Sequence, residues 1–151
     1  MKVEKSKEMP EIQLKYVPSR AEKTKIRWSD DAYKVFLTLF NPDTIEYMEE
    51  AIVLFLTKAN NTIGWARISS GGTDTTIIDP KVVFTMALNC GASYFIIGHN
   101  HPSGKLEASQ QDISITSDLR MAGKLLRLDL IDHLIVTPNG FYSFADKGQL
   151  Y

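Results

Sequence analysis

Cysteine is nearly absent from this sequence, since Cys90 is the single one among 151 residues. A disulfide within the chain is therefore impossible, and such cysteine usage is typical of a reducing compartment, so we expect a cytoplasmic protein. Long apolar runs are absent as well. No run approaches the roughly 18 residues that a membrane-spanning helix needs, and the first residues lack the apolar stretch of a secretory signal. The sequence therefore predicts neither a disulfide-stapled secreted fold nor a membrane protein.

An excess of basic charge is also missing. The 17 Lys and Arg residues are balanced by 18 Asp and Glu residues, for a net charge of −1. Residues 1–27 hold eight Lys or Arg and four Asp or Glu, so this segment carries +4. Elsewhere the sequence has no basic stripe with interleaved aromatic residues, which argues against a dedicated nucleic-acid binder. We expect residues 1–25 to form a basic arm, either a solvated leader or a weak contact to nucleic acid.

The remaining segment, residues 26–151, has the composition of one globular domain. The whole chain is 44% hydrophobic and 23% charged, values that are ordinary for a soluble protein. A chain of this length can bury a single sizeable core. No internal repeat divides it further.

Strands are predicted from apolar runs and from period-two alternation. Ala51–Leu56 is a continuous apolar run, as expected for a strand that is buried on both faces. Asn60-Asn61 would turn the chain into an antiparallel partner strand. The further strands are expected at Thr62–Ser69, Tyr94–Gly98, Leu128–Thr137 and Phe141–Phe144.

Helices are predicted between these strands from their capping residues. Ser29 would cap the first helix, and Asp79 followed by Pro80 would open the second. Ser109 would cap a third helix that runs to about Gly123. Strands mixed with helices in this order predict an α/β (α+β) fold with a mixed β-sheet sandwiched by helices.

The most informative stretch is Gly98–Gly104, which reads GHNHPSG. Side chains two apart on a strand point to the same side, so His99 and His101 would project together, and Pro102 favours an extended His101. Asp112 would lie in the first turn of the following helix, where its carboxylate can meet the imidazoles. Imidazole and carboxylate are zinc ligands, and a catalytic zinc keeps one position for water. The sequence therefore predicts a Zn²⁺ site formed by the two histidines and the aspartate.

A hydrolytic metal site also needs a general base. Glu49 and Glu50 both stand at the start of the apolar strand. Neighbouring residues on a strand point to opposite faces, so an assignment shifted by one residue would move the carboxylate to the other face. A second open question concerns His133, which alternates with Ile131 and Ile135. It is either a hydrogen-bonded core histidine or a partner that orients a zinc ligand.

These residues match a known family. The pattern His99-x-His101-Pro-x-Gly, then Ser109-x-x-Asp112, with a glutamate about 50 residues upstream, resembles the JAMM motif of MPN/JAB-domain metalloproteins. The closer resemblance is to the bacterial RadC-like branch, and it is carried by the segments GHNHPSG, ASQQDISIT, LIDHLIVT and FYSFADKG. It extends from about residue 26 to the C-terminus.

The resemblance implies a fold similar to that of cytidine deaminases, with a mixed sheet between helices. It implies zinc held by the residues that match at His99, His101 and Asp112, with water as the fourth ligand. The matching glutamate, which aligns with Glu49, is implied to be the general base. The matching serine, Ser109, is implied to help stabilise the oxyanion of the tetrahedral intermediate.

We therefore expect a zinc-dependent peptidase or isopeptidase whose substrate is a peptide or an isopeptide-linked protein. The alternative is a DNA-repair or anti-restriction accessory protein that binds DNA or a protein partner and uses its zinc structurally. Many RadC-like proteins carry a helical DNA-binding-like region, whereas here only the arm and one expected helix precede Glu49.

Two other metal-dependent classes fit the sequence poorly. An HNH endonuclease is disfavoured because the residues of that motif are not consecutive. A zinc deaminase is disfavoured because its H-x-E and P-C-x-x-C signature needs more cysteine than Cys90.

Overall fold

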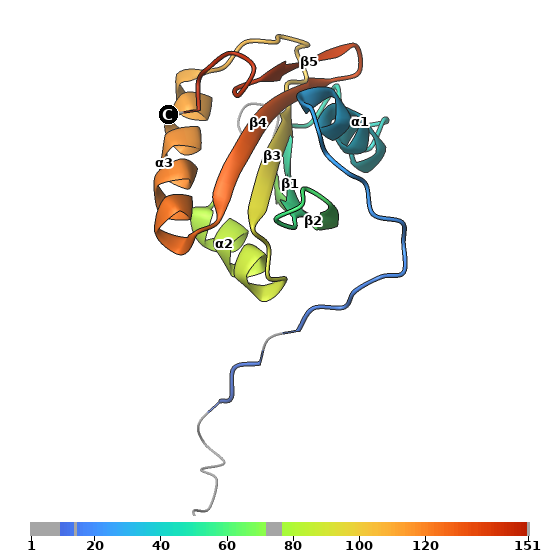
Figure 1. The fold of residues 1–151 in the computed structure, drawn as a ribbon. Helices are drawn as coiled ribbons and strands as arrows, with labels where there is room; N and C mark the ends of the chain where they lie inside the picture. Colours follow the sequence, from blue (N-terminus) through green and yellow to red (C-terminus); the bar gives the residue numbers. More distant parts are fainter. Residues whose placement is uncertain (1–9, 14, 72–76, 151) are drawn as a thin grey trace, which may run out of the picture.

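The computed structural model of the protein describes residues 10–13, 15–71 and 77–150 (Figure 1). A five-stranded sheet in the order β2-β1-β3-β4-β5 forms its centre. Helices cover both faces of this sheet, which confirms the predicted mixed sheet between helices. The described elements are, in chain order, α1 (Ser29–Leu39), β1 (Glu50–Leu56), β2 (Thr62–Ser70), α2 (Pro80–Asn89), β3 (Tyr94–Asn100), α3 (Gln110–Leu126), β4 (Asp129–Thr137) and β5 (Gly140–Ser143).

The sheet is antiparallel except at its centre. β1 pairs antiparallel with both β2 and β3, and β4 pairs antiparallel with β5. β3 and β4 are parallel, and α3 lies in the crossover connection that parallel neighbours require. The loop that leaves β3 therefore leads directly into the N-terminus of α3. The candidate ligands His99, His101 and Asp112 lie at this end of the sheet.

The alternation of side chains along β1 divides the apolar interior into two cores. Val53 and Phe55 pack on the face that α2 and α3 cover, whereas Ile52 and Leu54 pack on the face that α1 covers. Every residue of β1 is buried. The uninterrupted apolar run is thus explained, and the predicted strand with two buried faces is confirmed.

Gly98 shows how closely α1 packs on β3. A Cβ atom at Gly98 would lie 2.7 Å from the ring of Phe36, which α1 contributes. Such a contact is too short for any other residue, so glycine allows the Phe36 ring to approach the strand closely just before the histidines.

The predicted capping of α1 by Ser29 is wrong. The Ser29 hydroxyl donates to Asp146 Oδ2 at 2.6 Å, far along the chain. Asp31 Oδ2 instead accepts from the backbone N–H groups of Arg27 and Trp28, at 2.8 and 3.1 Å. The N–H groups of Asp31 and Ala32, which a serine cap would bind, donate to Trp28 O at 3.1 and 3.4 Å, so the serine is released for a tertiary contact.

The other helix termini agree in part with the sequence. Asp79 Oδ1 accepts from the N–H of Lys81 at 2.9 Å, which confirms the predicted cap of α2. α3 continues past Gly123, where a Cβ atom would lie 2.2 Å from the Leu128 carbonyl oxygen. This glycine therefore permits close packing, and the helix ends instead with Arg127 in the left-handed region (φ 54°). Among the helices of the described residues, none is long and apolar enough to cross a membrane.

The described part of the arm, residues 10–13 and 15–24, contains no helix or strand. Its end is attached to the sheet by backbone hydrogen bonds at the start of β2. Thr62 N donates to Thr24 O, and Ile26 N donates to Asn60 O, each at 2.9 Å. The chain then enters α1 on the far face from α3.

Candidate metal centre

The end of β3 and the residue that follows it bring two histidines to one point. His99 and His101 project to the face that α3 covers, as the alternation along a strand predicts. Their Nε2 atoms lie 2.9 Å apart. The His99 side chain is 1% exposed and that of His101 is 15% exposed. One imidazole is therefore fixed in the core, while the other borders solvent.

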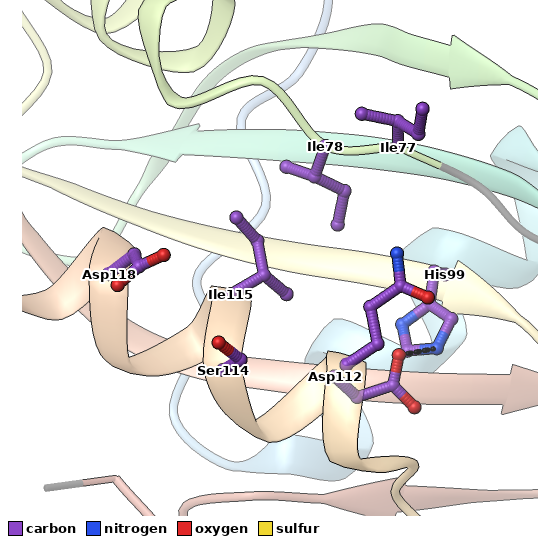
Figure 2. Close-up of a pocket in the computed structure, with 8 residues that line it drawn as sticks. Ile77, Ile78, His99, Asp112, Ser114, Ile115 and Asp118 are labelled. Carbon is purple, nitrogen blue, oxygen red and sulfur yellow. Dashed lines mark ion pairs between the residues drawn. The ribbon is translucent and has the colours of Figure 1, made fainter.

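Asp112 completes this cluster from the first turn of α3. Its Oδ1 atom lies 3.2 Å from His99 Nε2, and its Oδ2 atom lies 3.4 Å from His101 Nε2. Figure 2 shows the carboxylate directed from the helix towards His99 on the strand. The predicted meeting of the two histidines and the aspartate is confirmed in the geometry of the structure.

Ser109 lies directly beside this carboxylate. The Ser109 N–H donates to Asp112 Oδ2 at 2.8 Å, and Ser109 Oγ accepts from the Asp112 N–H at 3.0 Å. This reciprocal pair is a capping box, so the predicted cap is confirmed. Ser109 is exposed, and its hydroxyl hydrogen is not needed for the cap, so it can donate to another group.

A tight turn after His101 returns the chain towards α3. Gly104 N donates to His101 O at 2.9 Å, and Gly104 adopts φ +78°, a conformation that favours glycine. The next residue, Lys105, places its carbonyl oxygen 2.9 Å from His101 Nδ1. The turn therefore both reverses the chain and orients the second imidazole.

The structure separates the two candidate bases. The ligand atoms of Glu49 and of both histidines all lie within 4.8 Å of one another. Glu50 Oε1 instead lies 3.4 Å from Arg67 Nε. The register explains the difference: β1 pairs Ala51 with His99, and residues two apart share a face. Glu49 therefore faces the histidines, and Glu50 faces away from them.

Asn100, between the two histidines, holds the backbone around Glu49. It is fully buried, and its Nδ2 atom donates to Ile45 O at 2.7 Å and to Met48 O at 2.8 Å. Its Oδ1 atom accepts from the Glu50 N–H at 2.7 Å. The role of this residue was not predicted from the sequence. The available signal was an amide within an apolar strand, because buried amides require partners.

A chain of hydrogen bonds runs from His99 into the protein. Thr116 Oγ1 lies 2.6 Å from the backbone carbonyl oxygen of Asp112, which can only accept, so the hydroxyl donates there. The same hydroxyl accepts from His133 Nδ1 at 2.6 Å. His133 is completely buried, and burial together with the nearby His99 holds its pKa well below the usual value. Its Nε2 atom is therefore unprotonated and accepts from His99 Nδ1 at 2.7 Å.

These directions decide both alternatives for His133 and fix the ligand atoms. His133 is a core histidine, and it is also the partner that orients His99. Since His99 donates through Nδ1 and His101 donates through Nδ1 to the Lys105 carbonyl, Nε2 is the atom of each imidazole that can bind a metal. Two Nε2 atoms 2.9 Å apart beside a carboxylate form a site for positive charge, which a proton or a metal cation can supply.

The spacing of the three ligand groups fits a small divalent cation. Zinc binds imidazole nitrogen and carboxylate oxygen at about 2.0–2.2 Å, so tetrahedral ligand atoms lie about 3.3–3.5 Å apart. The observed separations are 2.9 Å between the imidazoles and 3.2 and 3.4 Å to Asp112. Small adjustments would bring these atoms to tetrahedral positions.

The protonation of the ligands agrees with a cation site. Burial raises the pKa of Asp112, but hydrogen bonds with His101 and His99 outweigh it and hold that pKa far below its usual range. Burial lowers the pKa of His101, yet Asp112 and the Lys105 carbonyl together raise it above the usual value. The cluster thus keeps its carboxylate charged and attracts positive charge to the imidazoles.

A cavity of about 210 Å³ opens beside the cluster of His99, His101 and Asp112. It lies between α3 and the segment that precedes α2 (Figure 2). Both His99 and Asp112 contribute to its wall, so it is continuous with the cluster. The lining residues are Ile77, Ile78, His99, Gln111, Asp112, Ser114, Ile115 and Asp118.

Comparison with known proteins assigns the chain to a family. Residues 26–149 match the RadC-like JAB domain. A UPF0758 protein of Flavobacterium johnsoniae is 43% identical over 125 residues, which are 82% of this chain and 53% of the relative. A UPF0758 protein of Thermotoga maritima is 40% identical over 106 residues, 69% of this chain and 48% of the relative. The chain spans about half the length of these curated relatives, and it belongs to the RadC-like JAB domain family.

Proposed function

We propose that the protein is a zinc-dependent hydrolase of peptide or isopeptide bonds. His99, His101 and Asp112 would hold the metal, and Glu49 would act as general base. The observation that carries this proposal is the convergence of the Nε2 atoms of two imidazoles and a carboxylate beside Glu49. Membership of the JAB-domain family, which includes hydrolases, supports it.

The donor set favours a catalytic over a structural metal. With Glu49 as the base, His99, His101 and Asp112 would supply three ligands, whereas structural zinc sites use four protein ligands. The side chains of His101 and Asp112 are 15% and 13% exposed, so a water molecule and a substrate can reach them. Structural sites are closed to both.

Bound zinc would supply Lewis acidity and lower the pKa of its water from 15.7 towards about 7. Glu49 would remove a proton from the attacking water as the water oxygen bonds to the carbonyl carbon. The same carboxyl group would return that proton to the amine nitrogen as the carbon–nitrogen bond breaks. The Ser109 hydroxyl would donate to the oxyanion, because its oxygen already accepts from the Asp112 N–H.

The inner residues of the site would hold these groups in place. His133 fixes the tautomer of His99, and such outer partners sustain metal affinity. Asn100 fixes the backbone on both sides of Glu49. A base must lie within hydrogen-bond reach of the proton it removes, so the position of this backbone matters for the rate.

The test compares two glutamates that are adjacent in sequence and face opposite ways. The protein is loaded with zinc, analysed for metal, and assayed against a panel of fluorogenic peptides and lysine isopeptides. We expect about one zinc per chain. Glu49→Gln should keep the zinc and lose about 10²–10⁴-fold in turnover, whereas Glu50→Gln should keep both. Equal turnover in the wild type and Glu49→Gln would refute the assignment of the base.

Two further measurements, unfolding on chelation and DNA binding, address the accessory role. Zinc that is retained without hydrolysis of any panel member, together with unfolding on chelation, would favour a structural metal. Salt-sensitive binding of a short DNA duplex that is lost on deletion of residues 1–27 would favour contact of the basic arm with nucleic acid.

A further inference from the structure

The cavity beside the metal ligands extends along α3, away from the histidines. Asp112 and Asp118 both line it, and six residues of helix separate them by about 9 Å along the axis. Figure 2 shows Ile115 on the helix opposite Ile78, with Asp118 one turn further from His99. The cavity is therefore elongated, with the metal ligands at one end and a carboxylate at the other.

The walls and the far end differ in chemistry. Ile78, which is 8% exposed, and Ile115 form apolar walls, and Ile77, which is 74% exposed, lies at the rim. Ser114 and Asp118 are exposed on the helix. A side chain that enters from the metal end would thus pass apolar surface first and reach a carboxylate at solvent.

The charges that line the cavity are of one sign. Within the described part of the chain, the charged residues that line the cavity are Asp112 and Asp118. Asp112 is engaged by the two histidines and by the Ser109 N–H. Within the described residues, no ion pair or hydrogen bond engages the Asp118 carboxylate, so it is available to a ligand.

We propose that this cavity binds a lysine or arginine side chain of the substrate, next to the bond that is cleaved. Lysine and arginine bury their methylene stems along apolar surface while their charged heads stay in water. The isoleucine walls match the stem, and Asp118 matches the head. An apolar side chain would fill the walls but leave Asp118 unused, and an acidic one would meet like charge. This inference rests on the proposed function, because it presumes a peptide-type substrate.

The expected preference is modest, because Asp118 is exposed. Ion pairs at exposed positions contribute little and are screened by salt. We therefore expect a cationic side chain to improve affinity by about three- to five-fold over an uncharged chain of similar length, and this gain to shrink at high salt.

Hydroxamates test this inference without knowledge of the natural substrate, because the hydroxamate group anchors on zinc. Nα-acetyl-lysine, Nα-acetyl-norleucine and Nα-acetyl-glutamate hydroxamates are titrated into the zinc-loaded protein by calorimetry, with acetohydroxamate as reference. We expect the order lysine, norleucine, glutamate from tight to weak. Asp118→Asn should abolish the lysine advantage. Asp129→Asn, an exposed aspartate outside the cavity, makes the same charge change and should preserve it.

The apolar walls are tested by a second variant. Ile77→Ala should weaken both the lysine and the norleucine compound by about two-fold relative to acetohydroxamate, without a change in their ratio. Equal affinity of lysine and norleucine hydroxamates, or an unchanged ratio in Asp118→Asn, would overturn the inference. Failure of acetohydroxamate itself to bind would instead point to failure of the zinc assignment, on which the proposed function depends.

Discussion

The two faces of β3 carry buried polar side chains whose hydrogen-bond networks differ: one is satisfied within the protein, and the other is not. On the α1 face, the Asn100 amide uses its donors and its acceptor on three backbone groups. On the α3 face, a chain of hydrogen bonds runs from His99 through His133 to Thr116, and every donor and acceptor towards the interior has a partner. Outward, the Nε2 atom of the same imidazole lies 2.9 Å from the Nε2 atom of His101 and next to the Asp112 carboxylate. One network is closed, and the other is open to a cation.

Two carboxylates repeat this contrast. Asp132 accepts from Ser143 Oγ at 2.6 Å, from the His133 N–H at 2.7 Å and from the Ala145 N–H at 3.0 Å. Asp112 accepts from one backbone N–H and directs both oxygens to histidine nitrogens. Burial of polar groups therefore has two meanings here. Where donors and acceptors match, the cluster fixes backbone, and where acceptors converge, it requires a positive charge.

Removal of an open-network ligand should produce the largest effect. His99→Ala deletes a lone pair from the cluster, so we expect zinc affinity to fall by more than the 10–100-fold that loss of an outer partner costs. Competition with a chromogenic chelator measures this. Zinc bound at one per chain with undiminished affinity in His99→Ala would break the comparison at its centre.

Removal of the Asn100 amide, whose hydrogen bonds are all satisfied within the protein, should affect stability instead. Asn100→Ala leaves two carbonyls and one N–H without their partner, and we expect a loss of about 2–3 kcal/mol in the free energy of unfolding. Urea denaturation of the metal-free protein measures it, and Asn139→Ala, at an exposed turn, is the control. Zinc affinity should change by no more than about three-fold. A large loss of zinc affinity with unchanged stability would reverse the roles given to the two faces.

The open network depends on His133 in a graded way. His133→Phe keeps an aromatic ring to stack on Phe144, whose centroid lies 4.8 Å away, but it removes the acceptor that fixes the His99 tautomer. We expect zinc affinity to fall by about 10–100-fold while the protein remains folded. The chelator competition that serves for His99→Ala measures this as well, and affinity equal to wild type would show that the inner chain does not orient the ligand.

The sequence predicted the parts of the site that are local and missed those that depend on distant partners. The spacing of His99, His101 and Asp112 fixed their meeting because one strand, one turn and one helix cap connect them. The role of Asn100 depends on carbonyls more than 50 residues earlier, and no local pattern contains that information.

The choice between Glu49 and Glu50 needed the register of β1 on β3, which pairs Ala51 with His99. Sheet register is a tertiary property, so the local pattern left both candidates open, and only the family resemblance favoured Glu49. The wrong cap of α1 has a similar reason, because Ser29 bonds to Asp146, which lies far along the chain. The end of α3 is a local matter, since Gly123 packs against the carbonyl of Leu128, five residues later.

The Asp132 carboxylate, which is fully hydrogen-bonded within the protein, should show the smallest effect: a change in the pH dependence of stability. Burial raises the pKa of Asp132, and its hydrogen bonds from Ser143 and two N–H groups only partly offset this. The folded protein therefore holds this proton to higher pH than the unfolded chain does. Its contribution to stability is present below the unfolded pKa and is lost as pH rises through the folded pKa. Asp132→Asn should remove that decline, measured by urea denaturation of the metal-free protein from pH 4 to 7. An identical pH slope in both proteins would show that the three hydrogen bonds fully compensate the buried charge, and the contrast with Asp112 would then lie in ligand geometry alone.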